Sequence, residues 1–176
     1  MAENSKLRTE RLEDALALAS DTRVLILEAP YYQVVTDHLI AGANAVLEKY
    51  KSFGDRFQVT GALELPQALQ AAVKAGLVGG DAPQRYSGVI AVGCVIRGET
   101  SHYDIVCNNT NHWLMETIIR HNIPFGNAVL TVDTEAQALA RAQGGAVGKG
   151  GDAARACLRM IWLRQKFVDH QIAFRP

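Results

Sequence analysis

Residues able to do chemistry follow an apolar run in the segment VIRGETSHYD, residues 95–104. The apolar part is typical of a buried strand, and Gly98, Glu99 and Thr100 come directly after it, ahead of a predicted helix. Unpaired backbone amides at the start of a helix can hold a phosphate group. His102 follows within one turn, and its imidazole can move protons near neutral pH because the unperturbed pKa of histidine is about 6.5. A purely structural histidine is the alternative that the segment alone leaves open.

Two further polar clusters follow predicted strands. Tyr31 and Tyr32 could stack an aromatic face on a flat heterocycle, although an ordinary packing pair would look the same in the sequence. In GALELP, residues 61–66, Gly61 permits close backbone approach and Glu64 places a carboxylate near a helix start, where helix capping is the simpler explanation. Ligands of open parallel sheets bind beyond the carboxyl ends of the strands, which is where all three clusters are expected.

Several familiar site types are excluded by their spacing. QGGAVGKGG, residues 143–151, lacks the first glycine and the final Ser/Thr of a Walker A loop. GKGGDA, residues 148–153, fits a dinucleotide pattern, but no predicted strand leads into it. The five histidines offer no HExxH or other close ligand pair, so we expect no metal site. No GxSxG elbow is present, and neither Cys107 nor any serine has the signature of a nucleophile with its base.

Composition bounds the class of protein and its partners. With 176 residues, 48% of them hydrophobic, the chain can bury one well-formed core. Lys plus Arg equals Asp plus Glu, at 18 each, so neither nucleic acid nor an acidic membrane is an expected partner. A small molecule fits better.

Cysteine usage and the N-terminus indicate the compartment. Cys94, Cys107 and Cys157 are widely spaced and form no CxxC pair, which suits a reducing cytosol better than a disulfide framework or a zinc site. The first twenty residues lack the apolar core of a signal peptide, and no later run approaches the length of a membrane span. We therefore expect a soluble, cytoplasmic protein.

Periodicity predicts strands and helices in alternation. Short apolar runs predict strands buried on both faces at 23–29, 56–60, 88–96 and 128–132. Helices are predicted from a cap at Thr36 to Tyr50, from Pro66 to about residue 77, over 103–117, from a capping box at Thr134 and Gln137 to about Gln143, and from Asp152 to about Ile172. Such alternation forces crossover connections, so we expect an α/β fold with a mostly parallel central sheet flanked by helices.

Four blocks, GALELP, VIRGETSHYDIV, PFGNAVLTVDTEAQALAR and GKGGDAA, occur in the order and spacing of 6,7-dimethyl-8-ribityllumazine synthase, and the sequence closely resembles that family. The resemblance runs from about Arg23 to the C-terminal helix. It implies an N-terminal extension at 1–22 and a single flavodoxin-like domain, a three-layer sandwich, at 23–176. The implied reaction condenses 5-amino-6-ribitylamino-uracil with 3,4-dihydroxy-2-butanone 4-phosphate, the penultimate step of riboflavin biosynthesis, without a metal or organic cofactor.

The resemblance also assigns site residues position by position. It places the pyrimidine and its ribityl chain against Tyr31, Ala62, Leu63, Glu64, Val95, Ile96 and Asn127. The butanone phosphate is assigned to Gly98, Glu99, Thr100 and Arg141, the arginine coming from an adjacent subunit. His102 matches the proton-transfer histidine, and Lys149 matches a lysine of the C-terminal glycine-rich turn.

Two departures from the family pattern bear on function. The family often has phenylalanine where Asn127 stands and lysine where Gly145 stands, which puts ring coverage and one cationic contact in doubt. Asn127 could substitute hydrogen bonds for the ring, or Phe125 could supply nearby bulk. The alternative function is a catalytically weak flavin-binding, lumazine-binding or shell-forming protein of the same fold.

Assembly is the remaining expectation from the family. Its members form homopentamers, sometimes decamers or icosahedral shells, with active sites between neighbouring subunits. Shell-forming members pair an N-terminal strand with a neighbour, whereas RLEDALALAS, residues 11–20, has a helical pattern here. A pentamer or a decamer is therefore favoured over a shell.

Overall fold

The computed structural model describes residues 22–80 and 84–173, and within them four strands form one parallel sheet. In sheet order the strands are β2 (Phe53–Gln58), β1 (Arg23–Ala29), β3 (Gly88–Ile96) and β4 (Phe125–Val132). β3 therefore lies between β1 and β4, and the sheet order differs from the chain order because the connections cross over. The carboxyl ends of all of these strands lie at one edge of the sheet.

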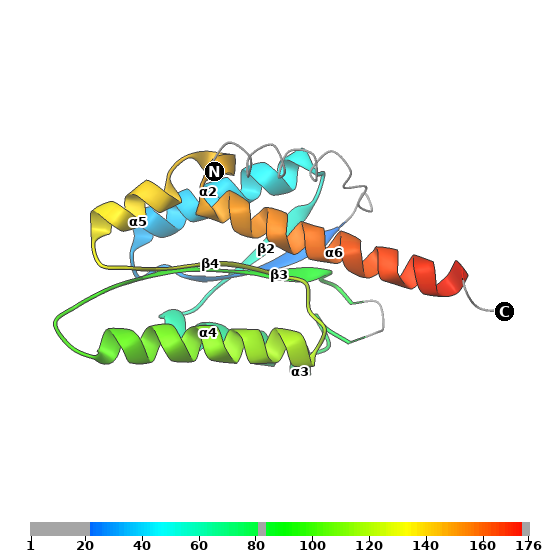
Figure 1. The fold of residues 1–176 in the computed structure, drawn as a ribbon, viewed down its shortest axis with the longest axis horizontal. Coiled ribbons are helices and arrows are strands. Elements are labelled where there is room, and N and C mark those ends of the chain that lie inside the picture. Colours follow the sequence, from blue (N-terminus) through cyan, green and yellow to red (C-terminus); the bar gives the residue numbers. More distant parts are fainter. Residues whose placement is uncertain (1–21, 81–83, 174–176) are drawn as a thin grey trace.

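Helices alternate with the strands and form the two outer layers. They are α2 (Gln33–Lys49), α3 (Leu65–Lys74), α4 (His102–Arg120), α5 (Glu135–Ala142) and α6 (Lys149–Ala173), with 3-10 turns η1 (Ala62–Glu64) and η2 (Gly145–Val147). α2, α5 and α6 cover one face of the sheet, and α3 and α4 cover the other (Figure 1). The predicted three-layer α/β fold is confirmed. The helical pattern predicted for residues 11–20 lies outside the described residues.

Each face of the sheet carries its own hydrophobic core. Along β1, Val24 and Ile26 pack into the core under α2 and α6, while Leu25 and Leu27 pack into the core under α3 and α4. A strand covered on both faces is apolar along most of its length, which explains the apolar runs of β1 and β3. Glu28 of β1 is the exception, and its buried carboxylate accepts from Nη2 of Arg56 at 2.9 Å. Among the described helices, none is both long enough and apolar enough to cross a membrane.

The edge strands depart from the sequence prediction. β2 begins at Phe53 rather than residue 56, and Phe53 and Phe57 are each 53% exposed. The prediction that this strand is buried on both faces is wrong, because β2 is an edge strand that pairs only with β1 and its two phenylalanines are largely exposed. β4 begins at Phe125, ahead of the predicted residue 128, because Phe125 and Gly126 already pair with β3.

Helix starts were predicted with mixed success. Thr36 is not a cap: α2 begins at Gln33, and the Thr36 amide donates to the Tyr32 carbonyl at 3.0 Å inside the first turn. The side chain of Thr134 does cap α5, with its hydroxyl accepting from the Gln137 amide at 3.2 Å. Pro66 lies in the first turn of α3, as predicted.

The glycine-rich stretch before α6 has a packing explanation. α6 begins at Lys149 rather than Asp152, so Gly150 and Gly151 lie in its first turn. A Cβ at Gly150 would overlap the Leu39 carbonyl of α2, and one at Gly151 would overlap the Ala146 carbonyl. The glycines therefore let α6 approach α2 and the η2 turn at backbone distance, which accounts for the dinucleotide-like spacing without a nucleotide.

Gly150→Ala should therefore destabilise the fold. Because the added methyl group meets backbone rather than a movable side chain, we expect the free energy of unfolding to fall by about 1–3 kcal/mol, measured by urea denaturation. Gly98→Ala is the control, since no atom lies within 4 Å of a Cβ built there. Equal stability of the two variants would contradict the packing explanation.

Candidate active site

A cavity of about 350 Å³ opens at the carboxyl ends of β1 and β3. Its size falls at the lower end of small-molecule sites, roughly 300–1,000 Å³. Four segments supply its wall: the β1–α2 connection, η1 with the preceding glycine, the last residues of β3, and the β3–α4 loop with the first turns of α4. The lining residues are Tyr31, Tyr32, Gly61, Ala62, Leu63, Glu64, Cys94, Val95, Ile96, Gly98, Thr100, His102, Tyr103 and Val106.

The aromatic wall is formed by Tyr31 and Tyr32. The two rings meet edge to face, with centroids 5.1 Å apart and an interplanar angle of 66°. Tyr32 is partly buried against the core, whereas Tyr31 is 75% exposed. The packing alternative thus describes Tyr32, and Tyr31 retains a free aromatic surface at the cavity for a flat ligand.

The opposite wall contains a carboxylate that does not cap its helix. Glu64 ends η1 and occupies the cap position of α3, but its side chain makes no capping hydrogen bond. A Cβ at Gly61 would lie 3.1 Å from Oε2 of Glu64, so the glycine leaves room for this carboxylate. Glu64 is therefore available to accept hydrogen bonds from a ligand's hydroxyl groups.

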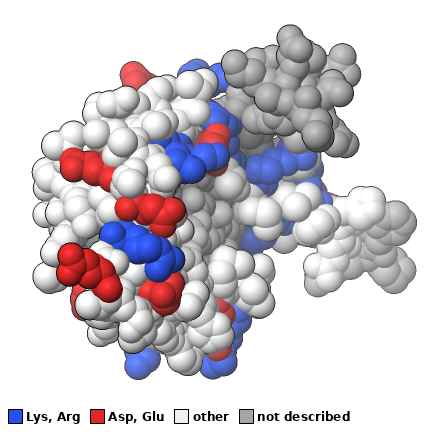
Figure 2. All heavy atoms as spheres, turned by 60° about the vertical axis from the view of Figure 1, so that its left-hand side comes forward, with Lys and Arg blue, Asp and Glu red and all other residues white. Residues whose placement is uncertain are grey.

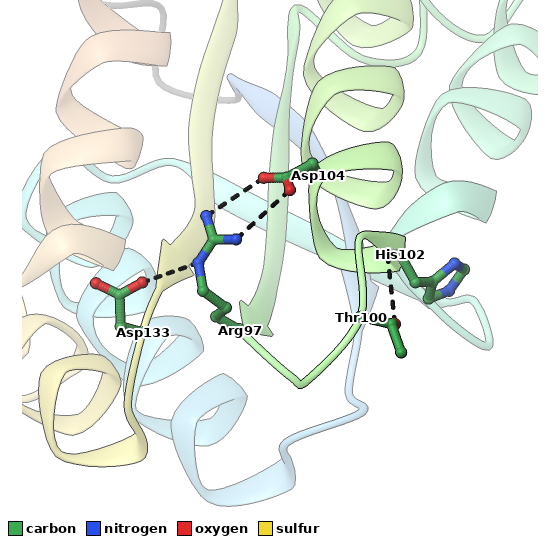
Figure 3. A network of polar contacts seen from close by, with 5 residues as sticks. All are labelled: Arg97, Thr100, His102, Asp104 and Asp133. Atoms are coloured by element: carbon green, nitrogen blue, oxygen red, sulfur yellow. Dashed lines mark hydrogen bonds and ion pairs between the residues drawn. The ribbon is translucent and has the colours of Figure 1, made fainter.

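The start of α4 forms the third wall. Ser101 occupies the cap position without a side-chain cap bond, and the His102 amide donates to Oγ1 of Thr100 at a long 3.4 Å. Nothing lies within 4 Å of a Cβ built on Gly98, so the loop has space on that side. A helix N-terminus beside an open loop suits an anion. The imidazole of His102 lines the cavity and points away from Arg97 and Asp104 (Figure 3).

Arg97 is occupied by carboxylates. Its Nε donates to Asp133 at 3.1 Å, and its Nη2 and Nη1 donate to the two oxygens of Asp104 at 3.3 and 3.5 Å (Figure 3). Its guanidinium carbon also lies 4.0 Å from the centroid of the Tyr103 ring. The hydrogen bonds to Asp104, with a smaller contribution from Asp133, raise the pKa of Arg97. This cation is therefore already paired and does not line the cavity.

Four residues predicted for the site lie outside the cavity wall of their own chain. Glu99 is exposed in the loop. Nδ2 of Asn127 donates to Oδ1 of the half-buried Asn111 of α4 at 2.7 Å. Arg141 is exposed on α5, with Nη1 donating to the Gln137 carbonyl, and Nζ of Lys149 pairs with Asp152 at 2.8 Å.

Phe125 does not replace the missing ring at Asn127. Its side chain is 8% exposed and packs into the core under α3 and α4. Gly145, where the family often has lysine, begins η2 with φ 54° and nothing within 4 Å of a Cβ built there. Gly145 in place of lysine thus leaves open space at the surface of η2.

Three wall residues escaped prediction: Cys94, Tyr103 and Val106. Cys94 belongs to the apolar run of β3, and Tyr103 and Val106 belong to the helix predicted over 103–117, so a structural role in these elements accounted for all three. The available signal was spacing, because Val106 lies one helical turn after His102 and Cys94 shares a strand face with Ile96.

The described part of the cavity wall lacks a permanent positive charge that could pair with an anionic ligand. Within the described part of the chain, the wall contains Glu64 and His102 but no lysine or arginine. Figure 2 brings forward the side of the molecule at the left of Figure 1, and acidic and basic residues are interspersed there rather than gathered into a basic patch. A phosphate bound at α4 would need a cation from elsewhere.

The cavity thiol is a poor nucleophile. Cys94 is 4% exposed, and burial raises its pKa to about 11. Burial likewise raises the pKa of Cys157 to about 12, and that of Cys107 to a smaller extent. Because the thiolate is the reactive form, covalent chemistry at Cys94 is disfavoured at neutral pH.

Thiol alkylation tests this environment. We expect iodoacetamide at pH 8 to label Cys107 first, because a shift of the Cys94 pKa from 9.0 to about 11 lowers its thiolate fraction about a hundredfold. Mass spectrometry of tryptic peptides reports each site, and labelling in urea, where all three thiols are exposed, is the control. Labelling of Cys94 as fast as Cys107 in the folded protein would contradict the burial of the Cys94 thiol.

Comparison with known proteins identifies relatives. Residues 21–165 match the family described as 6,7-dimethyl-8-ribityllumazine synthase. A protein of that name from Beijerinckia indica is 44% identical over 157 residues, covering 89% of this chain and 83% of the relative. One from Azorhizobium caulinodans is 44% identical (82% and 87% covered), and one from Bartonella bacilliformis is 43% identical (84% and 93% covered). The matched region includes every residue of the cavity wall.

Proposed function

The chain belongs to the 6,7-dimethyl-8-ribityllumazine synthase family, and we propose that this cavity is the active site at which it makes 6,7-dimethyl-8-ribityllumazine, called lumazine below. The enzyme, a transferase, condenses 5-amino-6-ribitylamino-uracil with 3,4-dihydroxy-2-butanone 4-phosphate. The observation that carries the proposal is the convergence of segments far apart in sequence, 31–32, 61–64, 94–96 and 98–106, around one cavity.

The pyrimidine is proposed to bind between β1 and η1. The exposed ring of Tyr31 stacks on the flat heterocycle, and the edge of β3 at Val95 and Ile96 borders it. The ribityl chain is held by the backbone of Ala62 and Leu63 and by the carboxylate of Glu64, which makes no capping bond to α3. The hydroxyl groups of the ribityl chain donate hydrogen bonds to this carboxylate.

The phosphate of the second substrate is proposed to bind at the start of α4. Gly98, Glu99 and Thr100 offer backbone amides and a hydroxyl group there, and the helix N-terminus favours an anion. Among the residues that the structure describes, the cavity wall has no lysine or arginine, so Arg141 of an adjacent subunit completes the charge, with Lys149 as a second candidate cation.

His102 is proposed to move protons during the condensation. The 5-amino group attacks the ketone, and water leaves as the imine forms. Phosphate is then eliminated to leave an enol, which tautomerises to a carbonyl. The ribitylamino nitrogen attacks this carbonyl, and a second water leaves as the second ring closes. Each step transfers protons, and His102 lines the cavity together with Gly98 and Thr100 of the proposed phosphate subsite. Holding both substrates in register supplies much of the rate, since effective molarities can reach about 10⁵ M.

A shared site requires an assembly. We propose a cytoplasmic homo-oligomer, a pentamer or paired pentamers, in which each cavity receives Asn127 and Arg141 from its neighbour. Both residues support this arrangement because they are exposed and lie outside the cavity of their own chain. Asn127 would offer an amide hydrogen where the family often places a ring.

Direct product formation tests the proposed function. The purified full-length protein is mixed with both substrates, and lumazine absorbance is followed together with phosphate release. We expect stoichiometric lumazine and phosphate. A protein that binds riboflavin or lumazine tightly but forms no product would instead be the catalytically weak binding protein.

Substitutions separate the two roles at the phosphate end. We expect His102→Ala to lower kcat about a hundredfold while leaving measurable turnover. Arg141→Ala should raise KM for the butanone phosphate about tenfold or more, since it removes a charge-assisted hydrogen bond, with little effect on KM for the pyrimidine. Steady-state kinetics with each substrate varied in turn is the measurement, and an unchanged rate for His102→Ala would remove it from the mechanism.

Co-expression of these two variants tests the shared site. Where the histidine comes from one subunit and the arginine from its neighbour, random mixing at equal amounts restores about a quarter of the sites. We therefore expect activity in the mixed oligomers well above the sum of the separate variants. Strictly additive activity would place both residues in the same chain's site.

A further inference from the structure

Arg97 lies at a junction that the proposed substrate contacts do not explain. It directly follows β3, and its amide donates to the Val132 carbonyl at the end of β4 at 2.9 Å. Its side chain reaches Asp133, the residue before the cap of α5, and Asp104, in the first turn of α4. One guanidinium therefore joins the ends of two strands to the starts of two helices (Figure 3).

The two arms of this junction lead to different parts of the proposed site. Asp104 is two residues from His102, and the neighbouring Tyr103, whose ring lies under the guanidinium, lines the cavity. Asp133 precedes α5, the helix that carries Arg141. The ion pair with Asp104 restrains the first turn of α4, which lines the cavity of the same chain. The ion pair with Asp133 restrains α5, the helix proposed to supply Arg141 to the cavity of a neighbouring subunit.

We propose that Arg97 is a positioning residue that aligns the α4 turn of its own site with the α5 helix that supplies Arg141 to the adjacent site. This inference rests on the proposed function. Arg97 does not bind the phosphate itself, because its three nitrogens donate to carboxylates and it is absent from the cavity wall.

Orientation rather than stability is the contribution of this network. The side chains of Arg97, Asp104 and Asp133 are 45%, 54% and 65% exposed, and ion pairs exposed to this degree contribute little to folding. A planar guanidinium nevertheless fixes the direction of the groups it binds, and stacking on Tyr103 restrains it further. Small misplacements of reacting groups have large effects on rate.

The chain offers a matched control at the other end of β3. Arg85 donates to Asp55 at 3.1 Å and to the Tyr86 hydroxyl at 3.2 Å, and its guanidinium carbon lies 5.5 Å from the Tyr86 ring centroid. Arg85→Gln thus removes the same kinds of contact near the amino ends of the strands, far from the cavity along the sheet.

Kinetics of Arg97→Gln test the proposal. We expect kcat to fall about tenfold and KM for the butanone phosphate to rise severalfold, while KM for the pyrimidine, which other segments hold, stays within about twofold. Arg97→Lys should recover only part of the loss, because an ammonium cannot bridge both carboxylates in a fixed plane. Arg85→Gln should match wild type.

Substitution of each aspartate removes one of the two ion pairs of Arg97 and leaves the other in place. Asp104→Asn should lower kcat, because it releases the turn that carries His102. Asp133→Asn should raise KM for the butanone phosphate, because it releases α5 with Arg141. Neither change should add its full effect to Arg97→Gln, since all three belong to one network.

Hydrogen exchange gives a readout that does not depend on turnover. Amides in the first turns of α4 and α5 should exchange faster in Arg97→Gln than in wild type, and at unchanged rates in Arg85→Gln. A wild-type protein that forms no lumazine would contradict the proposed function, while this exchange result would still decide the role of Arg97. Unchanged exchange, or equal losses in every kinetic constant of Arg97→Gln, would overturn the positioning role.

Discussion

The parallel pairing of β3 with β1 on one side and β4 on the other is the constraint on which the rest of the structure depends. It brings the carboxyl ends of these strands to one edge, where each strand passes into the segment that precedes the next helix. Tyr31 and His102 follow β1 and β3, and Glu64 follows β2, which pairs in parallel with β1. All three residues line the cavity although they are far apart in sequence. Because both faces of β1 and β3 are buried, this edge is also where their polar continuations can reach solvent.

The charge at this edge supports the proposal that a second subunit completes the site. A phosphate monoester carries about −1.5 to −2 charges near neutral pH, and a helix N-terminus offers only about half a positive charge. Arg97, which directly precedes Gly98, is already paired with two carboxylates. The missing charge must therefore come from outside the cavity wall, and Arg141, exposed on α5, suits a site on a neighbour.

Sequence predicted the layers and most of the cavity because both follow from local patterns. Buried strands are mostly apolar, and the polar residues that follow the strands indicate the edge where a ligand is expected. The structure has Tyr31, Glu64 and His102 on the wall of one cavity at this edge. Patterns failed where the deciding contact is distant in sequence. Thr36 has the residue type of a helix cap, but the helix already begins before it, since its amide donates to the Tyr32 carbonyl. The sequence of β2 resembles a buried strand, and its exposure follows from its place at the edge of the sheet, which the local sequence does not determine. The role of Arg97 could not be predicted for the same reason, because its partner Asp133 is 36 residues away in the chain.

The central claim is that two substrates meet in a cavity completed by a second subunit. A crystal structure of the assembled protein with a non-reactive ribitylamino-pyrimidine analogue and inorganic phosphate tests it most directly. The account predicts the heterocycle against Tyr31, phosphate at the start of α4, and Arg141 of an adjacent subunit within hydrogen-bonding distance of that phosphate. Phosphate bound by Arg97, or a site completed by residues of one chain, would contradict it.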